Sequence, residues 1–404
     1  MTAQPAELSP PAGVRRLLVA ASPGLGTHLA TYGPLPPASG ERILAEATAS
    51  GLTGRGGAAF PTAAKLRAVA RRRRTVVVAN AAEGEPLSDK DSCLLTLSPH
   101  LVLDGIALAA RAVHAREAYL VVGRSDLADL VELALRRRGD RVRVAVVRAR
   151  RRFVAGEESA VVDLLNGGPG LPTDKAVKVF ERGVGGRPTL VDNAETLAQL
   201  ALVVRYGAEW FRSVGTPDEP GTMLTTVSGA VAEPGVFEVA LGTPLALLLE
   251  AARMEDARAV LVGGFHGAWV PADEVGSVCL SRESLRRYDA APGAGVVRVL
   301  GPRDCGLVVA AAVTSYLAAE SAGQCGPCVN GLPRISHLMD RLARGEWHGL
   351  PEIRELERLQ GLVRNRGACS HPDGSERFVR STLRVFAEEV ALHLEGGCSA
   401  AAAR

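Results

Sequence analysis

Hydrophobic positions in the first half of the chain follow two periods in turn. The apolar runs "TVVVANA", "AYLVVG" and "RVRVAVVRA" predict strands, and the segments between them, "SPHLVLDGIALAARAVHA" and "SDLADLVELALRRRG", have helical spacing. Ser125 is the expected N-cap of the second helix and Gly139 its stop. Strands and helices that alternate in this way are typical of a parallel α/β sheet. We therefore expect an α/β domain over residues 41–217, after an irregular Pro- and Gly-rich arm at 1–40.

The pattern changes near residue 218. "GTMLTTVSGAVAEPGVFEVALGTPLALLLEAA" predicts two strands joined by a Pro-Gly turn and then one helix, and "ARAVLVGGFHGAWVP" adds a strand and a glycine turn. We expect a small β-grasp module over residues 218–303. Four segments with helical spacing follow and predict a helical bundle over 304–398, with a tail at 399–404.

Composition narrows the function classes. Of the 404 residues, 47% are hydrophobic, which is enough for two or three packed domains. The formal net charge of +3 gives no electrostatic case for binding nucleic acid. Only four of the 47 basic residues are Lys (65, 90, 175 and 178), so the Arg runs at 71–74 and 136–138 are interpreted as solvated helix ends.

The expected location follows from what the sequence lacks. Seven cysteines in 404 residues do not resemble a secreted disulfide scaffold, and the first residues have no signal-peptide apolar region. No stretch approaches the roughly 20 apolar residues that span a bilayer. We expect a reduced, cytoplasmic chain that reaches the cytoplasmic face of a membrane only through partner proteins.

A glycine-rich loop is the first candidate ligand site. In "SGLTGRGGAAFPTAAKL", Gly54, Gly56 and Gly57 leave the backbone open, and a Pro-Thr pair then starts a helix. Amide groups at such a turn and at a helix N-terminus bind phosphate, with Lys65 or Arg55 to neutralise it. The alternative is a tight structural turn, because no strand runs directly into the loop as in a dinucleotide fingerprint.

Polar residues that follow the predicted strands are the second candidate site. "NAAEGEP" places Asn80, Glu83 and Glu85 after a strand, where α/β sheets bind ligands. Asn80 could contact a flavin, and the two carboxylates could accept from a nicotinamide or a ribose hydroxyl.

Two helix starts carry further polar candidates. "GEES" places Glu157 and Glu158 at a helix start, where they are either ligand contacts or dipole-stabilised caps. Asn193 in "VDNAETLAQL" lies near another helix cap.

A cysteine loop is the third candidate. "ESAGQCGPCVNG" has Cys325 and Cys328 three residues apart, and Ala322 stands three residues earlier, where a metal loop would have another cysteine. The residues alone leave two interpretations open: a cluster loop that has lost one ligand, or a loop without metal.

The order of these motifs resembles one known family. "GRGGAAFPTAAK", "NAAEGEP", "SPHLVLDGIALAA", "GEESA", "RPTLVDNAETLAQL", "GAVAEPGVFEV" and "ESAGQCGPCVNG" are similar to the flavin-binding, NADH-oxidising subunit of respiratory complex I and its relatives in soluble hydrogenases and formate dehydrogenases. The resemblance runs from about residue 40 to 398. It implies a Rossmann-like FMN domain, a ubiquitin-like β-grasp (SLBB) domain and a helical bundle that holds a [4Fe–4S] cluster.

The resemblance also implies roles for individual residues. Hydride would pass from NADH to FMN, and single electrons would leave through the cluster to a thioredoxin-like [2Fe–2S] subunit or a ferredoxin. Glu83 and Glu85 would be the catalytic carboxylates, and Phe60 would stack on the adenine of NADH. The residues expected to hold FMN or the nucleotide are Gly54, Arg55, Gly56, Gly57, Lys65, Asn80, Glu157, Glu158 and Asn193.

Three departures from the family pattern concern the NADH side. Ala82 replaces a family carboxylate, and Leu66, Arg67 and Ala68 stand where the family has aromatic residues. A Pro-Phe-Pro segment expected near residue 180 is "KVFERG" here. Ala82, the missing aromatic residues and Ala322, which stands at a ligand position of the cysteine loop, support an alternative function, that of a non-catalytic paralogue acting as an assembly or binding subunit.

The family cluster has three cysteines at intervals of three and a fourth about forty residues later. Cys325, Cys328 and Cys369, 41 residues on, match three of these positions, and Ala322 cannot be a ligand. The expected cofactor is a [4Fe–4S] cluster with an incomplete ligand set, with Ser321 or His371 as a fourth group; a [3Fe–4S] cluster, zinc with His371, or an empty site are the alternatives. No role is expected for His266 or for the other cysteines, Cys93, Cys279, Cys305 and Cys398.

Overall fold

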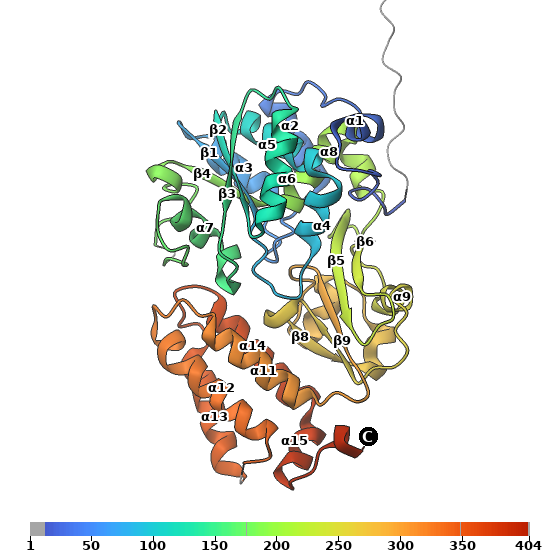
Figure 1. Cartoon of the computed structure of the whole chain (residues 1–404), viewed down its shortest axis with the longest axis vertical. Helices are drawn as coiled ribbons and strands as arrows, with labels where there is room; N and C mark the ends of the chain where they lie inside the picture. Colours follow the sequence, from blue (N-terminus) through green and yellow to red (C-terminus); the bar gives the residue numbers. More distant parts are fainter. Residues whose placement is uncertain (1–12, 175, 348, 403–404) are drawn as a thin grey trace, which may run out of the picture.

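The computed structural model describes residues 13–174, 176–347 and 349–402, which form two sheet-containing regions and a set of C-terminal helices (Figure 1). The arm expected to be irregular, residues 1–40, contains a helix in the structure, α1 (Leu25–Tyr32). Two buried side chains hold this helix: His28 bonds to Asp104 at 2.8 Å, and the Tyr32 hydroxyl donates to Leu17 O at 2.9 Å. The rest of the arm, residues 1–12, lies outside the described residues.

The first region is a four-stranded parallel sheet with helices on both faces, as the sequence predicts. The strands are β1 (Val76–Ala81), β2 (Glu117–Val122), β3 (Arg143–Arg148) and β4 (Thr189–Asn193), in the order β3-β2-β1-β4. The helices are α2 (Gly40–Ser50), α3 (Thr62–Ala70), α4 (Lys90–Leu97), α5 (Pro99–Ala112), α6 (Ser125–Arg136), α7 (Glu158–Leu165) and α8 (Ala194–Arg212).

Alternating side chains of β1 fill the two cores of this region. Val77 and Ala79 pack into the larger cluster with α5 and α8, whereas Val76 and Val78 pack with Val161 of α7 on the opposite face. A strand that is buried on both faces has no polar position to spare, which explains its continuous apolar run.

The second region is a five-stranded mixed sheet of order β6-β5-β9-β7-β8. Its strands are β5 (Thr222–Gly229), β6 (Gly235–Ala240), β7 (Ala259–Val262), β8 (Ala268–Pro271) and β9 (Val296–Leu300), and its helices are α9 (Leu245–Ala251) and α10 (Arg282–Leu285). β5 pairs antiparallel with β6 and parallel with β9. The β-grasp assignment of this region remains a prediction.

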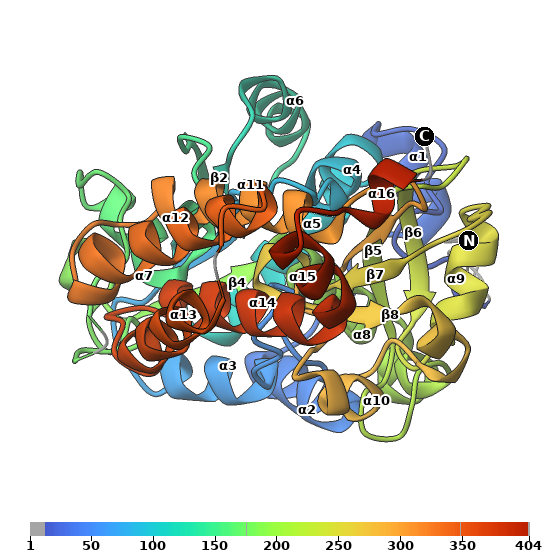
Figure 2. The same cartoon turned by 90° about the horizontal axis from the view of Figure 1, so that it is seen from below.

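The C-terminal helices pack against one another below the sheets, and Figure 2 looks onto them. They are α11 (Gly306–Ala319), α12 (Leu332–Ala343), α13 (Leu350–Val363), α14 (His371–Val385), α15 (Ala387–Leu394) and α16 (Ser399–Ala402). The fourth helix expected from the sequence is therefore two helices. The backbone leaves the helical conformation at Phe386 (φ −105°, ψ 33°), and its ring fills space against Gly306.

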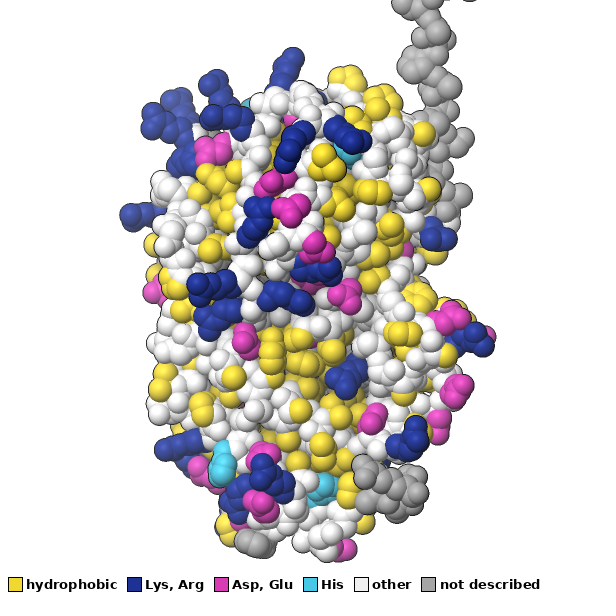
Figure 3. Space-filling model, viewed as in Figure 1, with side chains coloured by type: hydrophobic (Ala, Val, Ile, Leu, Met, Phe, Trp, Pro, Cys, Tyr) yellow, Lys and Arg dark blue, Asp and Glu magenta, His cyan; other side chains and the backbone are white. Residues whose placement is uncertain are grey.

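Within the described residues, no single helix has the length and apolar character to cross a membrane; one pair, α4 and α5, passes that test only together and is bent by 97°. All seven cysteines lie in the described part, and none forms a disulfide there. Basic and acidic side chains are interspersed over much of the face shown in Figure 3.

Candidate flavin and iron–sulfur sites

The predicted ligand-binding residues meet at the carboxyl ends of β1 and β4. In the strand order β3-β2-β1-β4 the strands after β1 are first added on one side of it and β4 is then added on the other, and α/β sheets bind ligands where the strand order reverses in this way. Asn80 and Asn193 are direct partners in the β1–β4 register. The Asn80 side chain donates to Gly156 O at 2.8 Å, which ties the "GEES" segment to the same place. Three segments that are distant in sequence therefore form one site.

The glycine loop meets this point with two amides unpaired. Among the described residues, the N–H groups of Gly56 and Gly57 donate to no protein acceptor, whereas that of Gly54 bonds to Phe60 O at 2.9 Å. A Cβ at Gly56 would lie 3.3 Å from Asn193 Cβ, and Gly57 has φ +108°, a conformation that L side chains rarely adopt. Two free amides on a loop that excludes side chains fit a phosphate group.

Lys65 supplies the positive charge at this point. Its Nζ donates to Val191 O at 2.8 Å and lies 3.3 Å from Glu158 and 3.6 Å from Asp192. Burial lowers the pKa of Lys65, but Asp192 and Glu158 raise it more, so the ammonium stays charged. Burial raises the pKa of Asp192 to about 6, against the opposing effect of Lys65. An ammonium placed between two acids can also neutralise a bound phosphate.

The structure does not bring the Arg55 side chain to the loop surface. Its guanidinium is buried, 4% exposed, and donates to the carbonyl oxygens of Thr222 and Pro220 at 3.1 and 3.0 Å. The sequence-based placement of this side chain at a phosphate therefore has no support, and Arg55 instead joins the loop to the start of the second region.

The two acidic residues of "GEES" have different environments. Glu157 is the N-cap of α7 and accepts from the amides of Ser159 and Ala160 at 2.8 and 3.2 Å. Glu158 stays half-exposed, at 41% of its side chain, beside Lys65. The capping alternative thus describes Glu157, and only Glu158 faces the candidate site.

Glu83 and Glu85 are also held by backbone amides. Glu83 has a left-handed backbone (φ +46°) and accepts from the amides of Asp91 and Ser92 at the start of α4. Glu85 accepts from the amide of Phe265, in the second region, at 2.8 Å. Burial raises the pKa of Glu85 to about 7, although its hydrogen bonds oppose this. Neither carboxylate is free in this structure, so their predicted catalytic roles remain predictions.

The raised pKa of Glu85 predicts a pH-dependent stability effect. The folded pKa of about 7 lies above the ordinary 4.5, so the contribution of Glu85 to stability is present below pH 4.5 and is lost as the pH rises through 7. Glu85→Gln keeps an acceptor for Phe265 N without the buried charge. We expect the variant to be more stable than the parent at pH 8, on the order of 2 kcal/mol, with a much smaller difference at pH 5, below about 1 kcal/mol.

Urea denaturation of both proteins at the two pH values measures this difference. Comparing the proteins at each pH removes the contribution of Glu238, whose pKa is also raised to about 7 by burial. A difference that is the same at both pH values would contradict the assignment.

A buried ionic network behind the site was not predicted from the sequence. Lys90 Nζ donates to Asp91, Glu195 and Asn193 at 2.8, 3.0 and 3.0 Å, and it is 2% exposed. Asn193 Nδ2 in turn donates to Asp91 at 2.7 Å and to Asn80 O at 3.2 Å. The network joins the start of α4 to the start of α8 and so fixes both asparagines. The scarcity of Lys in this chain was the only available signal.

The predicted departures on the NADH side have structural counterparts. Ala82 is 1% exposed in the apolar cluster of α7, and Leu66 is fully buried in the main core, so neither offers a surface to a ligand. Phe60, by contrast, is 52% exposed beside the glycine loop. The segment "KVFERG" contributes Arg182 and Gly183 to the lining of a cavity of about 310 Å³. Asn166 and Gly186 also line this cavity, and the glycine loop does not.

Two of the predicted sulfur ligands, Cys325 and Cys369, lie near the third, Cys328. Cys328 lies in a turn of π-helix, Pro327–Gly331, and the pKa of its buried thiol is raised to about 11 by burial and by the neighbouring Cys325 and Cys369. Burial raises the pKa of Cys325, but the amides of Ala368 and Cys328 and the Cys328 thiol lower it more, so this pKa lies below its ordinary value. Thiolates are the ligands of iron–sulfur clusters, so these residues fit a cluster with at least three thiolates.

Zinc on these cysteines with His371 does not fit. His371 Nε2 bonds to Leu317 O at 2.8 Å and Nδ1 to His266 Nε2 at 3.1 Å, so both ring nitrogens are occupied. Within the part of the chain that is described, no three ligand atoms of this loop lie within 4.8 Å of one another. Four ligands around one zinc ion would be closer, at about 3.3–3.8 Å.

The cysteine loop also contacts the first region directly. Glu320, which opens the loop, accepts from the amide of Phe153 at 2.9 Å, and Phe153 lies just before "GEES". The Phe153 ring packs against His266 and His371 with centroids 4.5 and 5.4 Å away. His266, for which no role was expected, therefore lies between the two candidate sites.

A parallel α/β domain with a glycine-rich loop, joined to a helical cysteine loop, is the arrangement expected of a flavin- and iron–sulfur-binding redox subunit. Residues 47–202 match the Nuo51 FMN-binding domain, and residues 308–393 match the NADH-ubiquinone oxidoreductase-F iron-sulfur binding region. The chain belongs to the family of the F subunits of NADH-quinone oxidoreductase.

Relatives and solved structures cover most of the chain. It is 31% identical to the F subunit of the NADH-quinone oxidoreductase of Aquifex aeolicus, over 87% of this chain and 85% of that protein. It is 30% identical to the NAD-reducing hydrogenase HoxS subunit alpha of Cupriavidus necator, over 86% of this chain but only 60% of that protein. A chain of the H2-reduced NAD+-reducing [NiFe]-hydrogenase superposes with a TM-score of 0.83 at 33% identity, over 88% of this chain and 63% of the other.

Proposed function

We propose that this chain is an electron-transfer subunit that takes electrons from NADH onto FMN and passes them through an iron–sulfur cluster to a partner protein. The observation that carries the proposal is the hydrogen bond of 2.9 Å between Phe153 and Glu320, which joins the segment before "GEES" to the cysteine loop. A donor site and an exit site that share a contact are what such a subunit needs.

The residues of the first site would hold FMN by its phosphate. The free amides of Gly56 and Gly57 and the Lys65 ammonium would bind the phosphate oxygens. Asn80 and Asn193, fixed in register, would border the flavin. When bound, FMN supplies the chemistry that links a two-electron donor to one-electron acceptors.

Cys325, Cys328 and Cys369 of the second site would hold an iron–sulfur cluster. When bound, such a cluster supplies one-electron transfer. Because Ala322 stands at the fourth ligand position, the site would offer one thiolate fewer than a [4Fe–4S] cluster has iron atoms. The partner would be a thioredoxin-like [2Fe–2S] subunit or a ferredoxin, because the relatives are named as subunits of larger redox enzymes.

Phe60 would stack on the adenine of NADH, and its removal tests this. We expect Phe60→Ala to raise KM for NADH about five-fold, because an aromatic stacking pair contributes about 1 kcal/mol. FMN content and kcat should change little. Steady-state oxidation of NADH with ferricyanide measures both constants, and Leu247→Ala, a similarly exposed site in the second region, is the control. An unchanged KM, or a loss of FMN, would contradict this role.

The proposal as a whole is tested on anaerobically purified protein reconstituted with FMN, iron and sulfide. We expect about one FMN per chain and a visible spectrum with flavin and iron–sulfur absorption, bleached by NADH. A colourless protein after reconstitution would overturn the proposal in favour of a non-catalytic paralogue. Bound flavin that NADH leaves oxidised would overturn the choice of donor alone.

A further inference from the structure

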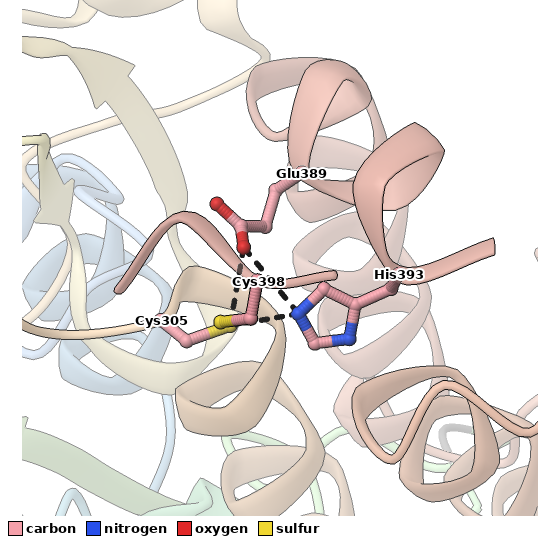
Figure 4. A group of neighbouring side chains, drawn as sticks. All are labelled: Cys305, Glu389, His393 and Cys398. Carbon is pink, nitrogen blue, oxygen red and sulfur yellow. Dashed lines mark hydrogen bonds and ion pairs between the residues drawn. The ribbon is translucent and has the colours of Figure 1, made fainter. Parts of the chain in front are cut away.

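Four side chains of metal-binding type meet at the far end of the C-terminal helices (Figure 4). Cys305 directly precedes α11, Glu389 and His393 lie one turn apart on α15, and Cys398 follows that helix. One ligand atom from each lies within 4.8 Å of all the others, and this is the only such group of three or more among the described residues. No local pattern of the sequence points to this group, because Cys305 is more than 80 residues away from the other three side chains.

The separations between these atoms match the edges of a tetrahedron around one metal ion. Cys305 Sγ is 3.4 Å from His393 Nε2 and 3.9 Å from Glu389 Oε1, and the last two atoms are 3.3 Å apart. Zinc–sulfur bonds of about 2.3 Å and zinc–nitrogen or zinc–oxygen bonds of about 2.0–2.1 Å give tetrahedral edges of about 3.3–3.8 Å.

Neighbouring groups orient two of the four ligands, His393 and Glu389. His393 Nδ1 lies 3.1 Å from Leu342 O, so the proton on Nδ1 leaves the Nε2 lone pair directed into the group. Glu389 is 3% exposed; its outer oxygen accepts from Arg258 at 2.6 Å, and its inner oxygen accepts from the amide of Ser399 at 3.0 Å. A lone pair, a carboxylate oxygen and two sulfur atoms thus converge in a buried space, which is an environment that favours a cation.

We propose that Cys305, Glu389, His393 and Cys398 bind one Zn²⁺ ion. Two sulfur ligands, one imidazole and one carboxylate in a closed tetrahedron are typical of zinc and suit a structural site without an open position. An iron–sulfur cluster does not fit, because several metal ions with their bridging sulfides would hold the ligand atoms farther apart than 4.8 Å.

The zinc site is distinct from the cysteine loop. Helix α11 has 14 residues and separates Cys305 at its start from the loop after its end, which corresponds to about 20 Å. Cys305 and Cys398 also lie outside residues 308–393, which match the iron–sulfur region. The ion would hold α15 and the segment after it against the start of α11, and Arg258 would connect the site to the second region.

Metal analysis of the full-length protein tests the proposal. We expect about one zinc per chain after purification without chelators, and at least a five-fold lower zinc content in Cys398→Ser and His393→Gln. Cys279→Ser, which changes a cysteine of the second region, should keep its zinc. Cys325→Ser/Cys328→Ser should also keep it, because the cysteine loop is a separate site.

A second measurement does not depend on the folding of variants. Zinc removed from the unmodified protein by a chelator should lower Tm, and Co²⁺ added in its place should give the visible absorption of a tetrahedral thiolate site. If the unmodified protein bound neither zinc nor Co²⁺ when each was added, the proposal would be overturned. Zinc that is lost from Cys325→Ser/Cys328→Ser but kept in Cys398→Ser would overturn it as well, by placing the ion in the cysteine loop. Iron in place of zinc would overturn the choice of metal.

Discussion

Replacing Lys65 by Met is expected to weaken FMN binding by 30-fold or more while leaving the affinity for riboflavin almost unchanged. A charge-assisted hydrogen bond contributes about 1.5–3 kcal/mol, and about 1.4 kcal/mol corresponds to a factor of ten in affinity. The loss should lie at the upper end of this range, because Glu158 and the buried Asp192 would then face the phosphate without a cation between them. Riboflavin has no phosphate, so its binding should not depend on Lys65.

Fluorescence titration of the apoprotein with each flavin measures both affinities. Lys178→Met is the matched control, because Lys178 is exposed and distant from the glycine loop in sequence. Lys65→Arg should retain part of the preference for FMN, since the charge remains but the contact with Val191 O changes. If Lys65→Met lost affinity for both flavins equally, Lys65 would support the fold of the site rather than bind the phosphate.

Local patterns predicted the elements that position this site. The apolar runs of β1 and β2 are buried in a parallel sheet, whereas β3, at its edge, is only partly buried. Asn193 caps α8 by accepting from the Glu195 amide at 3.0 Å, as a cap residue before a helical segment suggests. These features depend on neighbours within a few residues. The family could also be predicted, because each of its motifs is a short local pattern that can be recognised without knowledge of the tertiary structure.

What the sequence did not predict depends on partners far along the chain. Arg55 was expected at the phosphate from its place in the loop, but its guanidinium bonds to carbonyl groups more than 160 residues away. The zinc ligands and the partners of Lys90 are brought together only by the packing of separate elements. The break at Phe386 has no Gly or Pro to announce it and follows from the packing of that ring at Gly306. Tertiary contacts decided each of these cases.

Replacing Lys90 by Met is expected to lower the free energy of unfolding by about 3–5 kcal/mol, the usual cost of removing one partner from a buried ion pair. Burial lowers the pKa of Lys90 and the two carboxylates raise it more, so the side chain is charged in the folded protein. Without it, Asp91 and Glu195 lose the cation to which they are hydrogen-bonded, and the fully buried Glu195 keeps only the Coulomb attraction of Arg55. Met fills much of the volume, so the loss is electrostatic rather than a cavity.

The effect should also reach the flavin site, because Lys90 donates to the same Asn193 oxygen that caps α8. Urea denaturation measures the stability change, and hydrogen exchange of β4 and the first turn of α8 should locate it there. Adding Glu195→Gln to Lys90→Met should recover part of the loss, since it removes one of the two stranded charges. Lys178→Met again serves as the control for the loss of a lysine. A loss below about 1 kcal/mol, or a double variant no more stable than Lys90→Met, would show that the network does not hold the two asparagines by its charge.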